Sequence, residues 1–377
     1  MKIIYITNSL AVKAGIERTL TDKANYLANS GHQLTFVTYQ QGNHPISYIL
    51  HPSISYYDID CKAYLLCRYP LLKRIVKTIK LKLEFRRKWI SLVCQIVPDV
   101  IVTTTNSAEF MSEILAVRTC APIIIESHIA YTVQANVSSL LRYLRWKYRL
   151  YVYRKCDLFI ALTEGDAMYW KQHIPRVAKV DNPVTKYVDS PYLEKREEGR
   201  IISVGRMNNT QKRFDRLIDA FSTIAEKYPQ WHIDIFGEGD LQKSLEQQIE
   251  NLGLKSRVLI HPSTSNIYSE YLRSELFVLS SDYEGFGLVI VEAMACGVPV
   301  ISTDCPFGPS EIIEDGLTGL LSKMEVCDLA KKIEWMITHS DLRKKMGQKG
   351  HEAAKRYQLD VVMNDWINIY RSVLPDE

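Results

Sequence analysis

The sequence lacks any apolar run long enough to cross a bilayer as a helix. Such a span needs about 20 consecutive apolar residues, and the apolar runs in these 377 residues are shorter. Residues 1–6 are apolar, but they lead directly into polar residues 7–9 and have no small-residue cleavage site. We therefore interpret them as a first β-strand and not as a signal peptide.

Cysteine pairing motifs are missing as well. The cysteines form no C-x-x-C pair and no pattern with histidines, so no zinc site and no bound metal are expected. This usage indicates reduced thiols in a cytosolic protein. The eight cysteines are Cys61, Cys67, Cys94, Cys120, Cys156, Cys296, Cys305 and Cys327.

The small net charge of +4 hides an asymmetry between the two halves of the chain. Residues 1–182 contain 24 Lys and Arg against 13 Asp and Glu, whereas the remainder contains 23 against 30. A basic first half indicates an anionic partner, such as a membrane surface or a phosphorylated acceptor.

Strand and helix patterns alternate in the first half of the chain. A helical pattern at residues 17–29 ends at Gly31. Short apolar runs separated by helices are typical of βαβ units with a parallel sheet. The apolar runs lie at residues 2–7, 32–39, 98–104, 122–126 and 157–162.

The same pattern restarts at residue 200 and is clearer there. Strands are predicted at 200–205, 231–236, 258–261, 276–280 and 300–303, and helices at 214–228, 241–252 and 287–296. We therefore predict an α/β protein with two Rossmann-like domains, residues 1–182 and 200–377, joined by a polar linker at 183–199. Ligands of such sheets bind beyond the carboxyl ends of the strands, so a cleft between the facing domains is expected.

The most informative segment is SDYEGFGLVIVEAMACGVP at residues 281–299. Its glycines allow backbone N–H groups to approach a ligand, and the start of the following helix favours an anion. Glu284 and Glu292 are suited to sugar and ribose hydroxyls, because a carboxylate accepts paired hydrogen bonds from a diol. The glutamate pair alone would also fit an ordinary amphipathic helix, but the glycines and the A-x-G-x-P pattern favour a ligand site.

This segment resembles the E-x7-E motif of retaining glycosyltransferases of the group 1 family, which have the GT-B fold. The resemblance covers nearly the whole chain and is strongest at residues 200–319. It implies two Rossmann-like domains facing a cleft, with the C-terminal helix returning to the N-terminal domain. Glu284 would hold the donor sugar and Glu292 the ribose. The backbone amides facing the diphosphate would be those of Gly285, Phe286, Gly287 and Leu288.

A pair of cations follows the first strand of the second half. Arg206 comes directly after residues 200–205, and Lys212 lies six positions further on. An Arg fork and a Lys point charge can bind one diphosphate together, although the spacing alone fits two solvated surface cations equally well. The family has this G-R-x5-K arrangement, which implies that both cations stabilise the departing nucleoside diphosphate in place of a metal. Asp58 and Asp60 form a D-x-D pattern that we interpret as accidental.

The resemblance assigns three further residues to the site. Gly15 opens the first helix where the family has two adjacent glycines, and this chain has Ala14 before it. His128 follows a strand and matches a family histidine close to the transferred sugar, but a lone histidine is as often a core or surface residue. Gly237 resembles a family glycine near the base-binding pocket and also fits a simple tight turn.

Residues 62–89 combine many cations with regularly spaced apolar residues, and Glu84 is the only acid among them. This composition favours a basic amphipathic helix that lies on an anionic membrane surface. A second basic cluster with interleaved aromatic residues occupies positions 142–155. The alternative is a domain helix with a solvated charged face. No nucleic-acid module is recognisable, so nucleic acid is not an expected partner.

The sequence therefore predicts a metal-independent retaining glycosyltransferase without a cofactor. It would move a hexose or N-acetylhexosamine from a UDP-sugar to a lipid-linked saccharide at the cytoplasmic face of the membrane, for a surface polysaccharide. Two alternatives stay open: a sugar-nucleotide epimerase of the same architecture, and a non-catalytic membrane-docked protein that binds sugar nucleotides.

Overall fold

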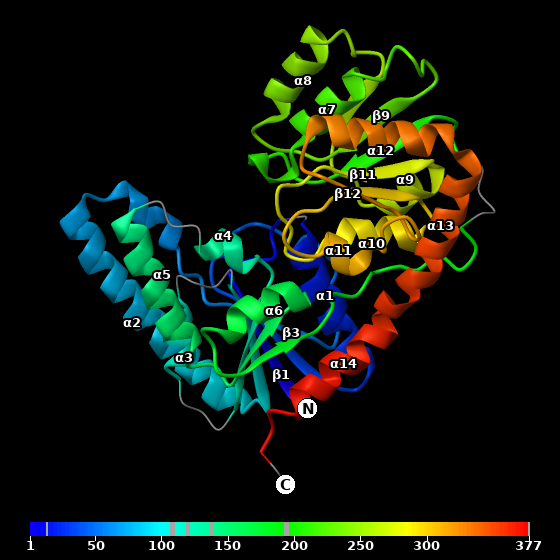
Figure 1. Ribbon diagram of the computed structural model, residues 1–377. Helices are drawn as coiled ribbons and strands as arrows, with labels where there is room; N and C mark the ends of the chain where they lie inside the picture. Colours follow the sequence, from blue (N-terminus) through cyan, green and yellow to red (C-terminus); the bar gives the residue numbers. More distant parts are fainter. Residues whose placement is uncertain (13, 106–109, 118–120, 136–138, 192–195, 376–377) are drawn as a thin grey trace. The chain divides into compact units, whose positions relative to one another are not determined.

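The computed structural model describes residues 1–12, 14–105, 110–117, 121–135, 139–191 and 196–375. Two compact units are present: unit 1 comprises Met1–Val180 and Met363–Glu377, and unit 2 comprises Asp181–Val362. Each unit contains one parallel sheet with its own buried apolar core (Figure 1). The predicted α/β class is confirmed.

Unit 1 has a seven-stranded sheet in the order β3-β2-β1-β4-β5-β6-β7. β1 lies between β2 and β4 and is almost completely buried, as its apolar sequence predicts. The strands are β1 (Lys2–Thr7), β2 (Gln33–Thr38), β3 (Ser55–Asp58), β4 (Val100–Thr104), β5 (Ile123–Ser127), β6 (Leu158–Ala161) and β7 (Val177–Lys179). The helices are α1 (Gly15–Asn29), η1 (Ala63–Arg68), α2 (Leu71–Ile96), α3 (Met111–Leu115), α4 (Tyr131–Ala135), α5 (Leu140–Tyr153) and α6 (Glu164–Lys171).

Unit 2 has a six-stranded sheet in the order β10-β9-β8-β11-β12-β13. The strands are β8 (Arg200–Val204), β9 (His232–Phe236), β10 (Val258–His261), β11 (Leu276–Leu279), β12 (Val300–Thr303) and β13 (Leu320–Ser322). The helices are η3 (Thr210–Lys212), α7 (Phe214–Ser222), α8 (Gln242–Asn251), α9 (Ile267–Arg273), α10 (Leu288–Ala295), α11 (Pro309–Ile312), α12 (Val326–Thr338), α13 (Ser340–Ala354) and η4 (Lys355–Tyr357).

The ends of the predicted second domain differ from the observed division. The linker predicted at 183–199 belongs to unit 2, where Val184 bridges to Gln358 and Arg196 donates to the carbonyl of Ser274; residues 192–195 lie outside the described chain. Helix α14 (Leu359–Arg371) begins in unit 2 and ends in unit 1. Residues 363–377 were predicted as part of the second domain, but they group with unit 1, as the expected return of the C-terminal helix requires.

Two helices differ from their predicted lengths. The helix predicted at 214–228 ends at Ser222, after which the backbone bonds include three-residue spacings such as Ile224 to Phe221. The basic helix predicted within 62–89 is divided in two, because Pro70 caps α2 and separates it from η1. α2 then continues to Ile96.

Candidate active site

The sheet order of unit 2 reverses between β8 and β11, which are paired neighbours. Ligands of open α/β sheets bind at such a switch point, beyond the carboxyl ends of the two strands. β8 leads into Gly205 and Arg206, and β11 leads into the segment that carries Glu284. The two motifs singled out in the sequence therefore flank one topological switch point.

Lys212 and Glu284 meet at this switch point. The Lys212 Nζ lies 2.8 Å from Glu284 Oε1, and both side chains are largely buried. Ser281 donates a second hydrogen bond to the same carboxylate oxygen, at 2.5 Å. A Cβ atom on Gly205 would lie 2.9 Å from the Lys212 carbon chain. A glycine at this position therefore leaves room for the lysine side chain. A cation and a carboxylate are thus available side by side for a charged, hydroxylated ligand.

Further residues, which the sequence did not single out, fix these two loops to each other. Arg216 donates to Asp282 at 2.6 Å and to the Ser280 carbonyl at 2.8 Å. Ser280 in turn donates to the Lys212 carbonyl at 2.8 Å. Arg213 also contacts Asp282, with a separation of 3.2 Å. The available signals were the acid two positions before Glu284 and the two arginines after Lys212, but only the fold shows that they pair.

The start of α10 supplies backbone N–H groups next to Glu284. Its N-cap is Gly287, in a left-handed conformation with φ of 98°, and no side chain caps the helix. A glycine tolerates this conformation without strain. Phe286 is buried and packs edge-on against Tyr357, so its side chain serves the core. The uncapped N–H groups and the helix dipole can bind an anion.

The second glutamate of the motif, Glu292, lies inside α10 and is 1% exposed. Tyr271 in α9 donates a hydrogen bond to its Oε2 at 3.1 Å. This contact fixes the orientation of the buried carboxylate.

Arg206 and Gly237 lie at the ends of neighbouring strands. Arg206 is exposed and forms no ion pair within the described residues, so its guanidinium is available to a ligand. A Cβ atom on Gly237 would lie 1.9 Å from the Gly205 carbonyl oxygen. The close approach of these two loops therefore accounts for a glycine at 237.

In unit 1, Gly15 starts α1 directly after Ala14, which offers no side-chain cap. His128 follows β5, and its Nε2 lies 3.1 Å from Glu126 Oε2. The other oxygen of Glu126 is 2.7 Å from Lys23 Nζ, and both of these side chains are fully buried. The sequence analysis missed this pair, although a glutamate at the end of the apolar run PIIIE was a signal.

The buried pair changes the ionisation of both of its members. Burial lowers the pKa of Lys23 to about 8, against the opposing effect of Glu126. Burial alone would raise the pKa of Glu126, but Lys23 and His128 outweigh it and the pKa lies below its ordinary value. Glu126 is therefore a carboxylate at neutral pH.

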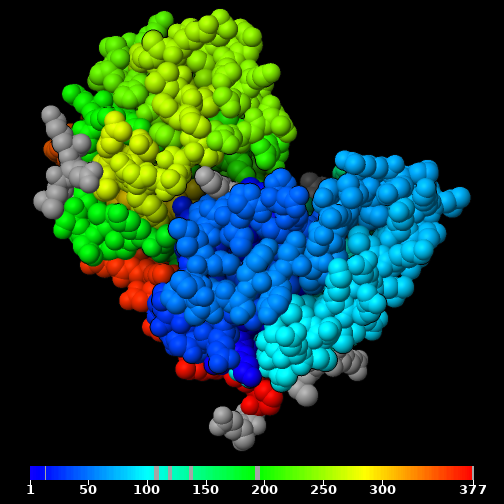
Figure 2. All heavy atoms as spheres, turned by 180° about the vertical axis from the view of Figure 1, so that it is seen from behind, coloured from blue at the N-terminus to red at the C-terminus, as the bar shows by residue number. Residues whose placement is uncertain are grey.

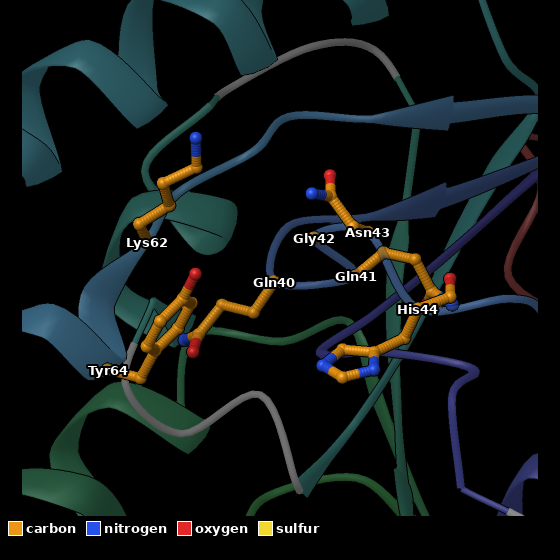
Figure 3. A pocket seen from close by; sticks show the side chains of 7 residues that line it. All are labelled: Gln40, Gln41, Gly42, Asn43, His44, Lys62 and Tyr64. Carbon is orange, nitrogen blue, oxygen red and sulfur yellow. The ribbon is translucent and has the colours of Figure 1, made fainter.

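A pocket of about 430 Å³ lies at the carboxyl ends of β2 and β3 (Figure 3). Gln41 is buried and bonds the loops together, accepting from Ser9 and Leu10 and donating to the carbonyls of His44 and Pro45. The lining residues are Gln40, Gln41, Gly42, Asn43, His44, Lys62 and Tyr64. Amides, a phenol and a cation, with no carboxylate among the lining residues, suit a hydroxylated ligand that carries an anionic group.

Within the described ranges, no three His, Cys, Asp or Glu side chains are grouped so that they could hold a metal ion. Asp58 accepts a hydrogen bond from Thr38, and Asp60 pairs with Lys62 at 3.1 Å. The seven cysteines in the described part of the chain are free thiols, and Cys120 lies outside it.

α2 and α5 expose apolar as well as basic side chains, and both pack against α3. Leu72, Val76, Ile79 and Leu83 recur at helical spacing, with exposures from 53% to 80%. Leu140, Leu141 and Leu144 of α5 are also exposed. Figure 2 shows the α2 region (light blue to cyan) at the surface. None of the helices in the described ranges is long and apolar enough to cross a membrane.

Comparisons with known proteins identify the family of the chain. The profile of the family "Glycosyltransferase Family 4" matches residues 14–185, and that of "Glycosyl transferases group 1" matches residues 189–353. An uncharacterized glycosyltransferase of Haemophilus influenzae is 25% identical, with 98% of this chain and 99% of the relative covered. The amylovoran biosynthesis glycosyltransferase AmsD of Erwinia amylovora is 23% identical over 98% and 99%.

Among solved structures, a mutant of S. aureus TarM in complex with fondaparinux, alpha-GlcNAc-glycerol and UDP superposes with a TM-score of 0.79. It is 16% identical, and 98% of this chain and 99% of the other are covered. This similarity shows the fold. With two consecutive family profiles covering nearly the whole chain, the protein is a member of the group 1 glycosyltransferases with the GT-B fold.

Proposed function

We propose that this glycosyltransferase is a retaining, metal-independent hexosyltransferase. It would move a hexose or N-acetylhexosamine from a UDP-sugar to a lipid-linked saccharide, for a surface polysaccharide. The contact between Lys212 and Glu284, beside the uncapped start of α10, carries the proposal. The cation and the anion-binding helix end suit the diphosphate of a sugar nucleotide, and the carboxylate suits the hydroxyls of its sugar.

Different residues of unit 2 bind different parts of the donor. Glu284 holds hydroxyls of the sugar, Glu292 holds those of the ribose, and Gly237 borders the base. Arg206, Lys212 and the N–H groups at the start of α10 receive the diphosphate. TarM crystallised with UDP, and AmsD bears a name from polysaccharide biosynthesis, which supports the donor and acceptor classes.

The transfer step needs no protein nucleophile. The acceptor hydroxyl oxygen forms a bond to the anomeric carbon on the face that UDP leaves, and the bond from that carbon to the phosphate oxygen breaks. UDP departs with the electron pair, and the hydroxyl proton passes to a phosphate oxygen of the departing UDP. Lys212 and Arg206 stabilise the charge that develops on UDP.

Calorimetry with a panel of UDP- and GDP-sugars tests the donor assignment. One UDP-sugar should bind, and Glu292→Gln should weaken it about 10- to 100-fold, because hydrogen bonds to a charged group are worth about 1.5–3 kcal/mol. Glu334→Gln, which removes a partly exposed carboxylate paired with Lys227, is the matched control. Equal affinities in all three proteins would overturn the site. Interconversion of the sugar nucleotide without acceptor would instead identify an epimerase. Because the proposed transfer is metal-independent, adding a chelator should leave the rate of transfer unchanged.

The pocket beside Lys62 and Tyr64 is our candidate for the acceptor. Lys62→Ala should raise the acceptor KM about 10-fold or more through the lost contact with an anionic group. The affinity for UDP should not change. Lys171→Ala is the control, because Lys171 also forms an exposed ion pair in unit 1. An unchanged acceptor KM in Lys62→Ala would remove the pocket from the acceptor site.

We also propose that the exposed faces of α2 and α5 dock on the cytoplasmic face of an anionic membrane. Each cation near such a surface contributes about 1 kcal/mol, and apolar side chains insert below the headgroups. Changing Leu72, Val76 and Ile79 to Ser should release the protein from anionic vesicles in a sedimentation assay. The same change at Leu252, Leu259 and Leu317, exposed leucines of unit 2, should not. Equal sedimentation of both triple variants would contradict the docking surface.

A further inference from the structure

The C-terminal helix contributes to the surroundings of His128. Tyr370 of α14 donates a hydrogen bond to Glu126 Oε1 at 3.3 Å. The Tyr5 hydroxyl lies 2.5 Å from that of Tyr370. Lys23 Nζ lies 3.1 Å from the centre of the Trp366 ring. Residues from β1, α1, β5 and α14 thus form one buried network that ends at His128, and all of them belong to unit 1.

This network is an unusual way to build a core. Lys23, Glu126 and Tyr370 have no exposed surface. Burying two charged side chains removes them from water, and this costs more free energy than burying two apolar side chains of similar volume. The three preceding strand positions in β5 are isoleucines. Stability alone therefore does not account for charged groups here.

The network determines which nitrogen of His128 carries the proton. Glu126 is ionised, and a carboxylate can only accept hydrogen bonds. Lys23 and Tyr370 already donate to its Oε1, and His128 Nε2 lies 3.1 Å from its Oε2. The Nε2 atom must therefore be the donor. In a neutral imidazole, Nδ1 is then the acceptor.

We propose that Lys23, Glu126 and Tyr370 are positioning residues that hold His128 in its Nε2–H tautomer. Nδ1 is then kept as an acceptor for a hydroxyl of the transferred sugar. The part that names the sugar rests on the proposed function, whereas the tautomer follows from the network alone. Helix α14 then contributes to the site through Tyr370, in addition to stabilising the fold.

Nitrogen NMR of protein labelled with [15N]histidine tests the tautomer directly at neutral to mildly alkaline pH. The chain has nine histidines, and His128→Gln identifies the signal of His128. We expect a neutral Nε2–H ring in the native protein. Glu126→Gln should shift the ring to a mixture of tautomers, and Tyr370→Phe should shift it part of the way. The control is Tyr153→Phe, which removes a buried hydroxyl elsewhere in unit 1 and should leave the signal unchanged.

Kinetics separates positioning from simple stabilisation. In Glu126→Gln, kcat of transfer should fall about 10-fold or more, while the affinity for UDP stays native. If Glu126→Gln does not fold, the spectra of the native protein and of Tyr370→Phe still test the tautomer of His128. A native Nδ1–H ring, an imidazolium, or a Tyr370→Phe spectrum identical to native would each overturn the proposal. A protein that shows the expected tautomer but transfers no sugar would contradict the proposed function and leave the network assignment standing.

Discussion

Lys212→Ala is expected to lower kcat/KM for sugar transfer by roughly 10²–10³-fold, the range seen when one preorganised group for a developing negative charge is removed. Its ammonium lies 2.8 Å from Glu284, which precedes the uncapped start of α10. Because the charge on UDP grows as the sugar departs, the loss should fall mainly on kcat. Steady-state kinetics with the identified donor measures it.

The control for this variant is Lys227→Ala. Lys227 forms an ion pair with Glu334 on the surface of unit 2, and such solvent-screened pairs contribute little. Its kcat/KM should be native. Thermal unfolding of Lys212→Ala shows whether the loop that holds Glu284 is intact. Native turnover in a folded Lys212→Ala protein, together with native turnover in Arg206→Ala, would exclude these cations as leaving-group partners.

Lys23→Met should lower the free energy of unfolding at neutral pH by less than the roughly 3–5 kcal/mol typical of a buried charge left without its partner, because losing the cation of Glu126 is partly offset by losing the desolvation of the ammonium that lowers the pKa of Lys23. The double variant Lys23→Met, Glu126→Gln removes both charges and should recover most of this loss. Chemical denaturation of both variants measures the difference. A Lys23→Met protein as stable as native would show that the pair is not needed to compensate Glu126.

The pH dependence of stability gives an independent check on Lys23. Its pKa is about 8 in the folded protein and 10.5 in its ordinary state. The unfolded chain therefore holds one proton more between these values, and this group makes the free energy of unfolding rise with pH from about 8 to 10.5. The rise is about 3 kcal/mol. Lys23→Met lacks the titrating group, so its stability relative to native should fall across this window.

Helices and strands could be predicted from the sequence wherever one short local signal was enough to define them. β1, β10 and β12 have the predicted bounds, because each is a short, mainly apolar run between turn residues, although β10 is an edge strand with Leu259 exposed. The α10 start was also readable, since Gly287 has a conformation that suits a glycine. The edge strands β3 and β7 were missed because they are short and only partly buried.

The contacts between distant residues could not be predicted from the sequence. Lys212 and Glu284 are 72 positions apart, and Lys23 and Glu126 are 103 apart. No local pattern encodes such a pairing, because it depends on the order of the strands in the sheet. Tyr370 joins Glu126 only because the last helix ends in unit 1, and helical periodicity states that a helix exists without stating what it packs against.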